Sequence, residues 1–329
     1  MTPFGLKRVL GLPTITFIAI GFTIGGGVFI FTGIVYKIVG PALPIAYALA
    51  LIPVYISMMP VAMLGSALPA TGGNYLYPSR LVSPGLAFVG IWIYALAAFF
   101  GQIPLYALGC AKYAQVFFPD LSPVIFAIVI VTFFYIINLF GFIFFVFGGA
   151  VLALTTTLNA LFIVGTKSLL VMVEDKLLPE IFGKVHSRFA TPHILLTIIW
   201  GLSVLGILSG FPLETLASYA ALGGLIIFLP IQIASMRLPK LYPQQYQQSE
   251  FKLKGIFLWF CPIVGIAMVV FFGIIILYEL NSPLKIGSFV AFIISGGVYY
   301  TMRSKFLKKR GIFIKDIIDK RGIWHVGSK

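Results

Sequence analysis

Long apolar stretches recur along almost the whole sequence, and they constrain the fold more than any other feature. Stretches long enough to cross the ~30 Å hydrocarbon core of a bilayer as helices lie at about 14–36, 42–66, 85–118, 122–146, 148–172, 192–210, 214–236, 255–280 and 284–302. In a bilayer, only helices and closed barrels satisfy all of their backbone polar groups internally. The lengths are those of helices, so the sequence predicts an all-α, polytopic membrane protein with about nine transmembrane helices.

The composition supports a membrane protein and argues against a nucleic-acid-binding one. Hydrophobic residues make up 60% of the chain and charged residues 10%, whereas a soluble domain has about 25% charged residues. The net charge is +14, but the basic residues fall in loops and in the C-terminal tail. That placement favours anionic lipid at the cytoplasmic face of a cell membrane. We expect one transmembrane domain over 1–302, a basic cytoplasmic tail over 303–329 and a cytoplasmic N-terminus. Neither a disulfide framework nor a metal site is indicated by Cys110 and Cys261, which lie in or near apolar segments.

Four glycines interrupt the first apolar stretch. They are Gly21, Gly25, Gly26 and Gly27, and each glycine in a helix interior costs roughly 1 kcal/mol relative to alanine. One interpretation is a helix broken at mid-membrane, which is how many secondary transporters build a substrate site. The other is close helix packing, because Gly21 and Gly25 also form a small-xxx-small pair. The glycines by themselves favour neither.

The distribution of basic residues is inconsistent with a simple count of nine helices. If Lys7 and Arg8 place the N-terminus in the cytoplasm, counting spans places the loop with Lys176 and Lys184 outside, along with the basic tail. The positive-inside rule requires both to be cytoplasmic. The first four helices and the last five therefore require opposite orientations, with the break near 141–148. Either one segment there does not span, or an odd number of helices is absent between the two blocks.

Three groups of motifs together resemble the amino acid–polyamine–organocation permease superfamily. The first is Ile24-Gly-Gly-Gly-Val-Phe29 followed by Gly40-Pro41-Ala42, and the second is Pro69-Ala-Thr-Gly-Gly-Asn-Tyr75, Ser83-Pro-Gly85 and Gly90-Ile-Trp-Ile-Tyr94. The third is Leu158-Asn159, Gly165-Thr-Lys167, Glu174-Asp175, Leu178-Pro179, Val185-His186 and Thr191-Pro192. Their order and spacing make the resemblance specific, and it covers nearly the whole chain.

This resemblance implies a leucine-transporter-type helical bundle. Residues 1–141 resemble the family's helices one to four, and 148–302 resemble helices eight to twelve. The family's fifth to seventh helices would then be absent, an odd number that agrees with the charge pattern. The implied function is secondary active transport of an amino acid or a related amine by alternating access. The alternative is a non-transporting, truncated permease remnant or a structural membrane subunit. The sequence contains no nucleophile–base constellation, so we expect neither an enzyme nor a cofactor.

The resemblance also assigns candidate substrate residues. In an unwound first helix, Ile24, Gly25, Gly26 and Gly27 would hold a substrate carboxylate, and Thr23 would add a hydroxyl. The half-helix that follows would present free N–H groups and its positive dipole end, which bind carboxylates without a cationic side chain.

Two aromatic residues and a run of hydroxyls complete the predicted site. The resemblance places Trp92 and Tyr94 near the pocket as wall or gate, and the alternative for each is ordinary helix packing. In related sodium-coupled folds, a hydroxyl pair of the eighth helix binds Na⁺, a hard cation with oxygen ligands. Thr156 and Thr157 are the candidates here, with H⁺ as the other possible coupling ion. The alternative for these hydroxyls is hydrogen bonding to their own helix or to a neighbouring one.

Overall fold

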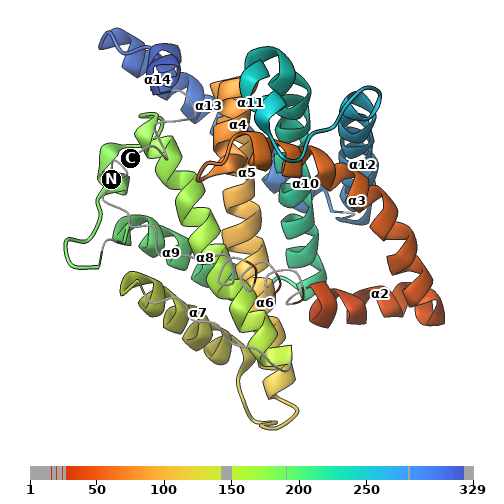
Figure 1. The fold of residues 1–329 in the computed structure, drawn as a ribbon. Coiled ribbons are helices and arrows are strands. Elements are labelled where there is room, and N and C mark those ends of the chain that lie inside the picture. The colour runs from red at the N-terminus through yellow and green to blue at the C-terminus, as the bar shows by residue number, and fades with distance from the viewer. Residues whose placement is uncertain are drawn as a thin grey trace.

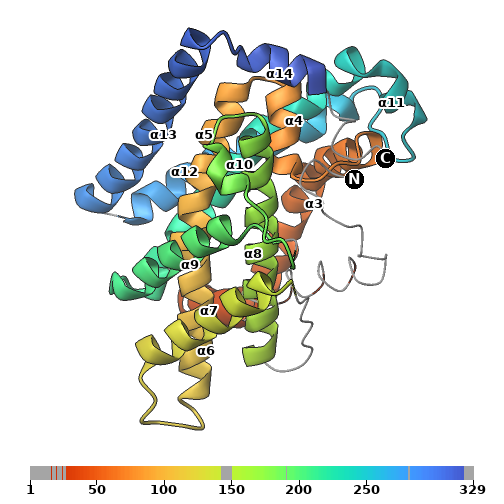
Figure 2. The same cartoon turned by 90° about the vertical axis from the view of Figure 1, so that its left-hand side faces the viewer.

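A computed structural model describes residues 27–141, 150–189, 191–280 and 282–321, together with Thr16, Ile20 and Ile24. Within these ranges every regular element is a helix (Figure 1). The all-α prediction is therefore confirmed. Figure 1 places the short helices α4, α11 and α14 at one end of the molecule, and Figure 2 shows α14 lying across that end beside α4.

The chain is helical from Gly27 to Ala67, but it is not one straight helix. A π-helical turn, η1 (Gly27–Phe31), leads into α2 (Thr32–Val39), the 3₁₀ turn η2 (Gly40–Ala42) and α3 (Leu43–Ala67). Gly40 lies in the left-handed region, with φ of 56°, and Pro41 follows it. A left-handed glycine ends a helix without steric cost, so α2 and α3 meet at an angle (Figure 1).

The next membrane span is a single long helix with an irregular middle. After α4 (Gly73–Leu81) come α5 (Pro84–Ala95), the π-helical segment η3 (Leu96–Gln102) and α6 (Ile103–Ala114). Ser83 caps α5 by accepting a hydrogen bond from the Leu86 N–H at 3.1 Å, and Pro84 occupies the first helical position, where its missing N–H costs nothing. Pro104 cannot donate to the carbonyl of Phe100, which is one reason for the wide turns that precede it.

Two shorter helices flank a long buried one. They are α7 (Pro123–Leu139) and α9 (His193–Leu208), and the long helix is α8 (Ala150–Glu174), followed by the turn η4 (Glu180–Gly183). At 17 and 16 residues, α7 and α9 are about 25 Å long, shorter than the bilayer core. They run antiparallel, because Trp200 donates to Thr132 Oγ1 at 3.0 Å and Thr191 Oγ1 donates to the Leu139 carbonyl at 2.6 Å.

The C-terminal part contains three long helices and two short ones. They are α10 (Leu213–Leu241), α11 (Pro243–Gln248), α12 (Phe257–Leu280), α13 (Pro283–Lys309) and α14 (Ile314–Arg321). Helix α13 continues to Lys309, so the expected boundary at residue 302 lies inside a helix. In the described residues, six helical stretches are long and apolar enough to cross a membrane, and α7 and α9 are shorter apolar helices. Of the first of the nine expected spans, 14–36, the structure describes residues 27–36 and the single positions Thr16, Ile20 and Ile24.

The end of α7 and the start of α8 bear on the charge-pattern argument. Asn138, in the last turn of α7, donates Nδ2–H to Asn159 Oδ1 at 2.7 Å. Asn159 lies about 14 Å along α8 from its first residue, Ala150. Helix α7 thus ends beside the middle of α8, so its end and the start of α8 form neither a tight hairpin nor a crossing of the full bilayer. The absence of the family's fifth to seventh helices stays a prediction.

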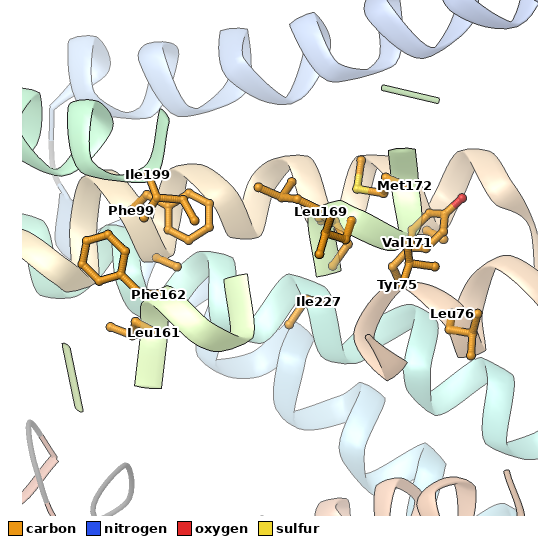
Figure 3. Packing of buried hydrophobic residues seen from close by; sticks show 14 of the residues in the cluster. Tyr75, Leu76, Phe99, Leu161, Phe162, Leu169, Val171, Met172, Ile199 and Ile227 are labelled. Carbon is orange, nitrogen blue, oxygen red and sulfur yellow. The ribbon is translucent and has the colours of Figure 1, made fainter. Parts of the chain in front are cut away.

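The hydrophobic core surrounds α8. Figure 3 shows Phe99, Phe162 and Ile199 gathered at one end of the cluster and Tyr75 and Val171 at the other. Small residues bring the helices together, as is common in membranes. A Cβ on Gly101 of η3, for example, would lie 3.2 Å from the backbone nitrogen of Ala220 in α10.

Candidate functional site

The π-helical turn η1 is held against α6. Ile30 is buried and fills the space above Gly109 of α6, where an added Cβ would overlap the Ile30 side chain and lie 3.8 Å from Leu154 of α8. The Tyr113 hydroxyl donates to the Phe29 carbonyl at 2.5 Å, and the two rings meet edge to face with centroids 6.5 Å apart. The irregular turn after the glycine cluster is thus fixed against α6, which continues the span that carries Trp92 and Tyr94.

The predicted carboxylate-binding residues lie at the start of this turn. Thr23, Gly25 and Gly26 fall outside the described residues. Ile24 is helical and 47% exposed, and Gly27 is the first residue of η1. In the described residues the first helix is therefore widened into a π turn at Gly27, and its expected unwinding at Gly25–Gly26 stays a prediction.

Trp92 lies in an aromatic stack between α5 and α13. Its ring stacks on Phe292 and Tyr299, both with centroids 5.5 Å away, and its Nε1–H donates to Ser295 Oγ at 3.3 Å. A Cβ on Gly296 would lie 2.5 Å from Trp92 Cδ1. These contacts belong to helix packing and not to η1, so the structure does not bring Trp92 together with Gly27. Tyr94 is partly buried and packs against the main core cluster.

The predicted ion-site hydroxyls are buried within α8. Thr157 is 0% exposed and Thr156 is 6% exposed. Thr157 follows Leu154 by three positions, so it lies near the face of α8 that approaches Gly109 of α6. Further along the same helix, the Thr166 hydroxyl donates to the Phe162 carbonyl at 2.5 Å, which is the ordinary back-bonding of a membrane helix.

Sequence reasoning missed a buried cluster at the other end of α8. Asp175 is 0% exposed; its Oδ1 accepts from Arg80 Nη2 at 2.8 Å, and its Oδ2 accepts from Arg80 Nη1 and, at 2.8 Å, from the Tyr75 hydroxyl. Arg321 of α14 approaches the same carboxylate at 4.0 Å and Glu174 at 3.7 Å. The available signal was the positive-inside rule, which places Arg80 and the loop with Lys176 and Lys184 on the same, cytoplasmic side.

Burial and charge set the protonation states in this cluster. Burial alone lowers the pKa of Arg80, but the hydrogen bonds and charge of Asp175 outweigh it and raise that pKa. Burial, with the nearby Asp175 charge, raises the pKa of Tyr75 well above its usual value. Arg80 is therefore a fixed cation and Tyr75 a fixed hydrogen-bond donor. The ion pair and the tyrosine hydrogen bond therefore join α4 to the end of α8.

Comparison with known proteins identifies relatives of both halves of the chain. A sequence profile described as "Amino acid permease" matches residues 14–147, and a second amino acid permease profile matches residues 140–301. The methylthioribose transporter of Bacillus subtilis is 30% identical over 158 residues, which are 48% of this chain and 32% of that protein.

Two further relatives show similar levels of identity. The branched-chain amino acid permease BcaP of Bacillus subtilis is 28% identical over 117 residues, 36% of this chain and 25% of that protein. The S-adenosylmethionine permease SAM3 of Saccharomyces cerevisiae is 30% identical over 137 residues, 41% of this chain and 23% of that protein. The match thus spans less than a third of the length of each of these three relatives.

Proposed function

Because this chain is a polytopic membrane protein of the amino acid permease family, we propose that it is a secondary active transporter for an amino acid or a related amine. The substrate would bind beside the glycine cluster of the first helix and cross by alternating access. The N-terminus and the basic tail would face the cytoplasm, and the protein would lie in the cell membrane. Two of the three relatives are named for cargo with an α-amino acid group, branched-chain amino acids and S-adenosylmethionine, and the third is named for methylthioribose, a sugar derivative.

The observation that carries the proposal is the position of η1. This irregular turn follows Gly25 and Gly26 directly, and it is fixed against α6 by the Tyr113–Phe29 hydrogen bond. Irregular backbone at membrane depth is tolerated where it is buried in protein or lines a cavity. A substrate carboxylate would take N–H groups of the half-helix that begins near Val28, whose dipole favours an anion.

A coupling ion would bind between η1 and α8. Thr157 is buried near the α8 face that approaches Gly109 of α6, and its hydroxyl, with that of Thr156 and carbonyls of the first helix, would supply the oxygen ligands that Na⁺ prefers. Proton coupling is the other possibility. Uptake driven by a sodium gradient at fixed pH, compared with uptake driven by a pH gradient without sodium, separates the two.

The test of transport is uptake by the full chain reconstituted in proteoliposomes. A panel of radiolabelled amino acids and amines is offered, with empty liposomes as the control. We expect saturable uptake of at least one α-amino acid, and Gly27→Val to abolish it while a correctly folded, helical protein is retained. A folded protein that takes up nothing across the panel would contradict the proposal.

That negative result would support a non-transporting remnant or a structural membrane subunit. One observation favours this second function: the N-terminal half of α3 has little cover within the described residues. Tyr55, near the middle of the helix, is 65% exposed, and Leu51 is 64% exposed. A helix face of this kind is available for packing against another membrane protein.

A further inference from the structure

The last turns of α13 concentrate positive charge at the level of the membrane surface. Between residues 303 and 310 there are five basic side chains, which are Arg303, Lys305, Lys308, Lys309 and Arg310. Four of them are exposed and Arg303 is half-buried. Arg303 lies about 30 Å along the helix from Pro283, the thickness of the hydrocarbon core. The cluster therefore emerges from the bilayer at the depth of the lipid headgroups.

These charges are not neutralised by the protein. Among the described residues, the ion pairs within 4.0 Å involve Arg80, Lys176 and Arg321, and none involves the five residues of this cluster. Arg303 instead donates Nε–H to the Lys176 carbonyl at 2.9 Å. Its guanidinium is thus fixed in place with its charge unpaired.

An aromatic ring lies within the cluster. Phe306 is 43% exposed, with the Arg310 guanidinium 4.4 Å and the Arg303 guanidinium 5.5 Å from its ring centroid. Met302 lies one helical turn before Phe306, on the same face of α13, and is 68% exposed. An exposed apolar ring between two guanidinium groups matches the boundary between acyl chains and charged headgroups.

The chain after the cluster is fixed to the protein. Gly311 adopts φ of 74° and turns the backbone, after which Ile314 and Ile318 of α14 are buried in the core. Arg321 then approaches Glu174 at 3.7 Å. This arrangement anchors both ends of the basic segment, so its charges are presented from a rigid helix and not from a loose tail.

From these observations we infer that residues 303–310 form a binding site for anionic phospholipid. The lysines and Arg310 bind the headgroup phosphate, whose negative charge no headgroup cation offsets, and Phe306 and Met302 contact the acyl chains. A zwitterionic lipid offers the same phosphate but no net charge, so it binds more weakly. The inference rests on the position of α13 in a membrane and is independent of transport activity.

The test uses the purified full chain in detergent micelles and fluorescently labelled phosphatidylglycerol or phosphatidylcholine, followed by anisotropy. We expect phosphatidylglycerol to bind at least about tenfold more tightly, with an affinity that falls as salt is added. Each lysine near an anionic lipid surface contributes about fivefold to affinity. The triple variant K305Q/K308Q/K309Q should therefore lose on the order of a hundredfold.

The matched control removes the same charge elsewhere on the same end of the molecule. Lys184, Lys240 and Lys254 are exposed, and K184Q/K240Q/K254Q should change the affinity for phosphatidylglycerol by less than about threefold. Equal loss in both triple variants would overturn the site, as would equal binding of the two lipids. Full displacement of the lipid by inorganic phosphate or by polyglutamate at equal concentration would also overturn it, since the site would then recognise a free anion or an acidic protein.

Discussion

Arg80 and Asp175 form a buried ion pair that joins the first half of the chain to the second, with Arg80 Nη2 2.8 Å from Asp175 Oδ1. The Arg80 side chain is 2% exposed and Asp175 is 0% exposed. Arg80 belongs to α4, between the second and third of the expected spans, and Asp175 follows directly after α8. The pair therefore fixes the end of α8 against α4 whether or not other helices once lay between the two halves.

The first prediction is that breaking this pair destabilises the protein strongly. Asp175→Asn leaves the Arg80 cation buried without its counter-charge, and we expect a loss of about 3–5 kcal/mol of unfolding free energy. Denaturant unfolding in mild detergent, followed by circular dichroism, measures it. Glu180→Gln is the control, because Glu180 is exposed and its pair with Lys176 is long, at 3.8 Å. A D175N protein within about 1 kcal/mol of the natural chain would contradict the prediction.

Replacing both partners should cost much less than replacing one. In the double variant R80M/D175L no buried charge is left unpaired, and apolar replacements of similar volume are often neutral or stabilising. We expect the double variant to regain most of the stability that D175N loses. If the double variant is as unstable as D175N, then the hydrogen bonds of Tyr75 or the contacts of Arg321, and not the unpaired charge, decide the stability.

A second prediction concerns Tyr75 and alkaline pH. Its hydroxyl donates to Asp175 at 2.8 Å, and burial raises its pKa well above 10.0. Above pH ~10 the unfolded chain loses a proton that the folded chain keeps, so the stabilising contribution of this group is complete below that pH and is lost as the pH rises.

Tyr75→Phe removes both effects. At neutral pH it should cost about 1.5–3 kcal/mol, the usual value for a hydrogen bond to a charged group. Between pH 9 and 11, the thermal midpoint of Y75F should fall less steeply than that of the natural chain. Parallel curves for the two proteins would show that another group causes the alkaline loss.

The third prediction compares two adjacent glycines of α10. A Cβ on Gly223 would overlap Ala97 of η3 and lie 3.3 Å from the Ile93 carbonyl, whereas one on Gly224 would meet nothing within 4 Å. We expect Gly223→Ala to destabilise by about 1–3 kcal/mol through overpacking and Gly224→Ala to be neutral or stabilising by up to about 1 kcal/mol. Thermal unfolding of the two variants side by side tests this, and equal effects would mean that η3 and α10 are not in close contact.

The fourth prediction tests how η1 is fixed. Tyr113→Phe removes the hydroxyl that binds the Phe29 carbonyl at 2.5 Å but keeps the ring contact. We expect a stability loss of only about 0.5–1.5 kcal/mol, together with a raised KM for uptake if the proposed substrate site is correct. Tyr135→Phe is the control: Tyr135 of α7 also makes a hydroxyl contact between helices, to Thr197 of α9 at 2.9 Å, and neither residue belongs to η1 or α6. An equal KM change in both variants would contradict a special role for η1.

Several features of the fold followed from local sequence. Apolar length predicted the long helices, and the expected spans 42–66, 214–236 and 255–280 agree closely with α3, α10 and α12. The resemblance predicted the family, and the family profiles confirmed it. The π turns were not predicted, because apolar periodicity does not distinguish a π-helical segment from an α-helical one.

The site was predicted less completely, and the reason is distance along the chain. Trp92 was assigned a wall or gate, but its ring partners Phe292 and Tyr299 come from α13, some two hundred positions later. Arg80 and Asp175 were not paired from the sequence, since they lie 95 positions apart. Only the packing of α4 against α8 removes both from solvent.

The sequence by itself determined that the chain lies in a bilayer and that its secondary structure is helical, because apolar runs of this length cannot leave their backbone groups unpaired in lipid. It also determined where the first helix is weakened, through the glycines at 21 and 25–27. The tertiary structure decided which side chains meet. Ile30 lies over Gly109, and Tyr113 reaches the Phe29 carbonyl. Arg80 and Asp175 satisfy one another because α4 packs against α8, and the charge pattern gives the membrane face of each residue but not its partner.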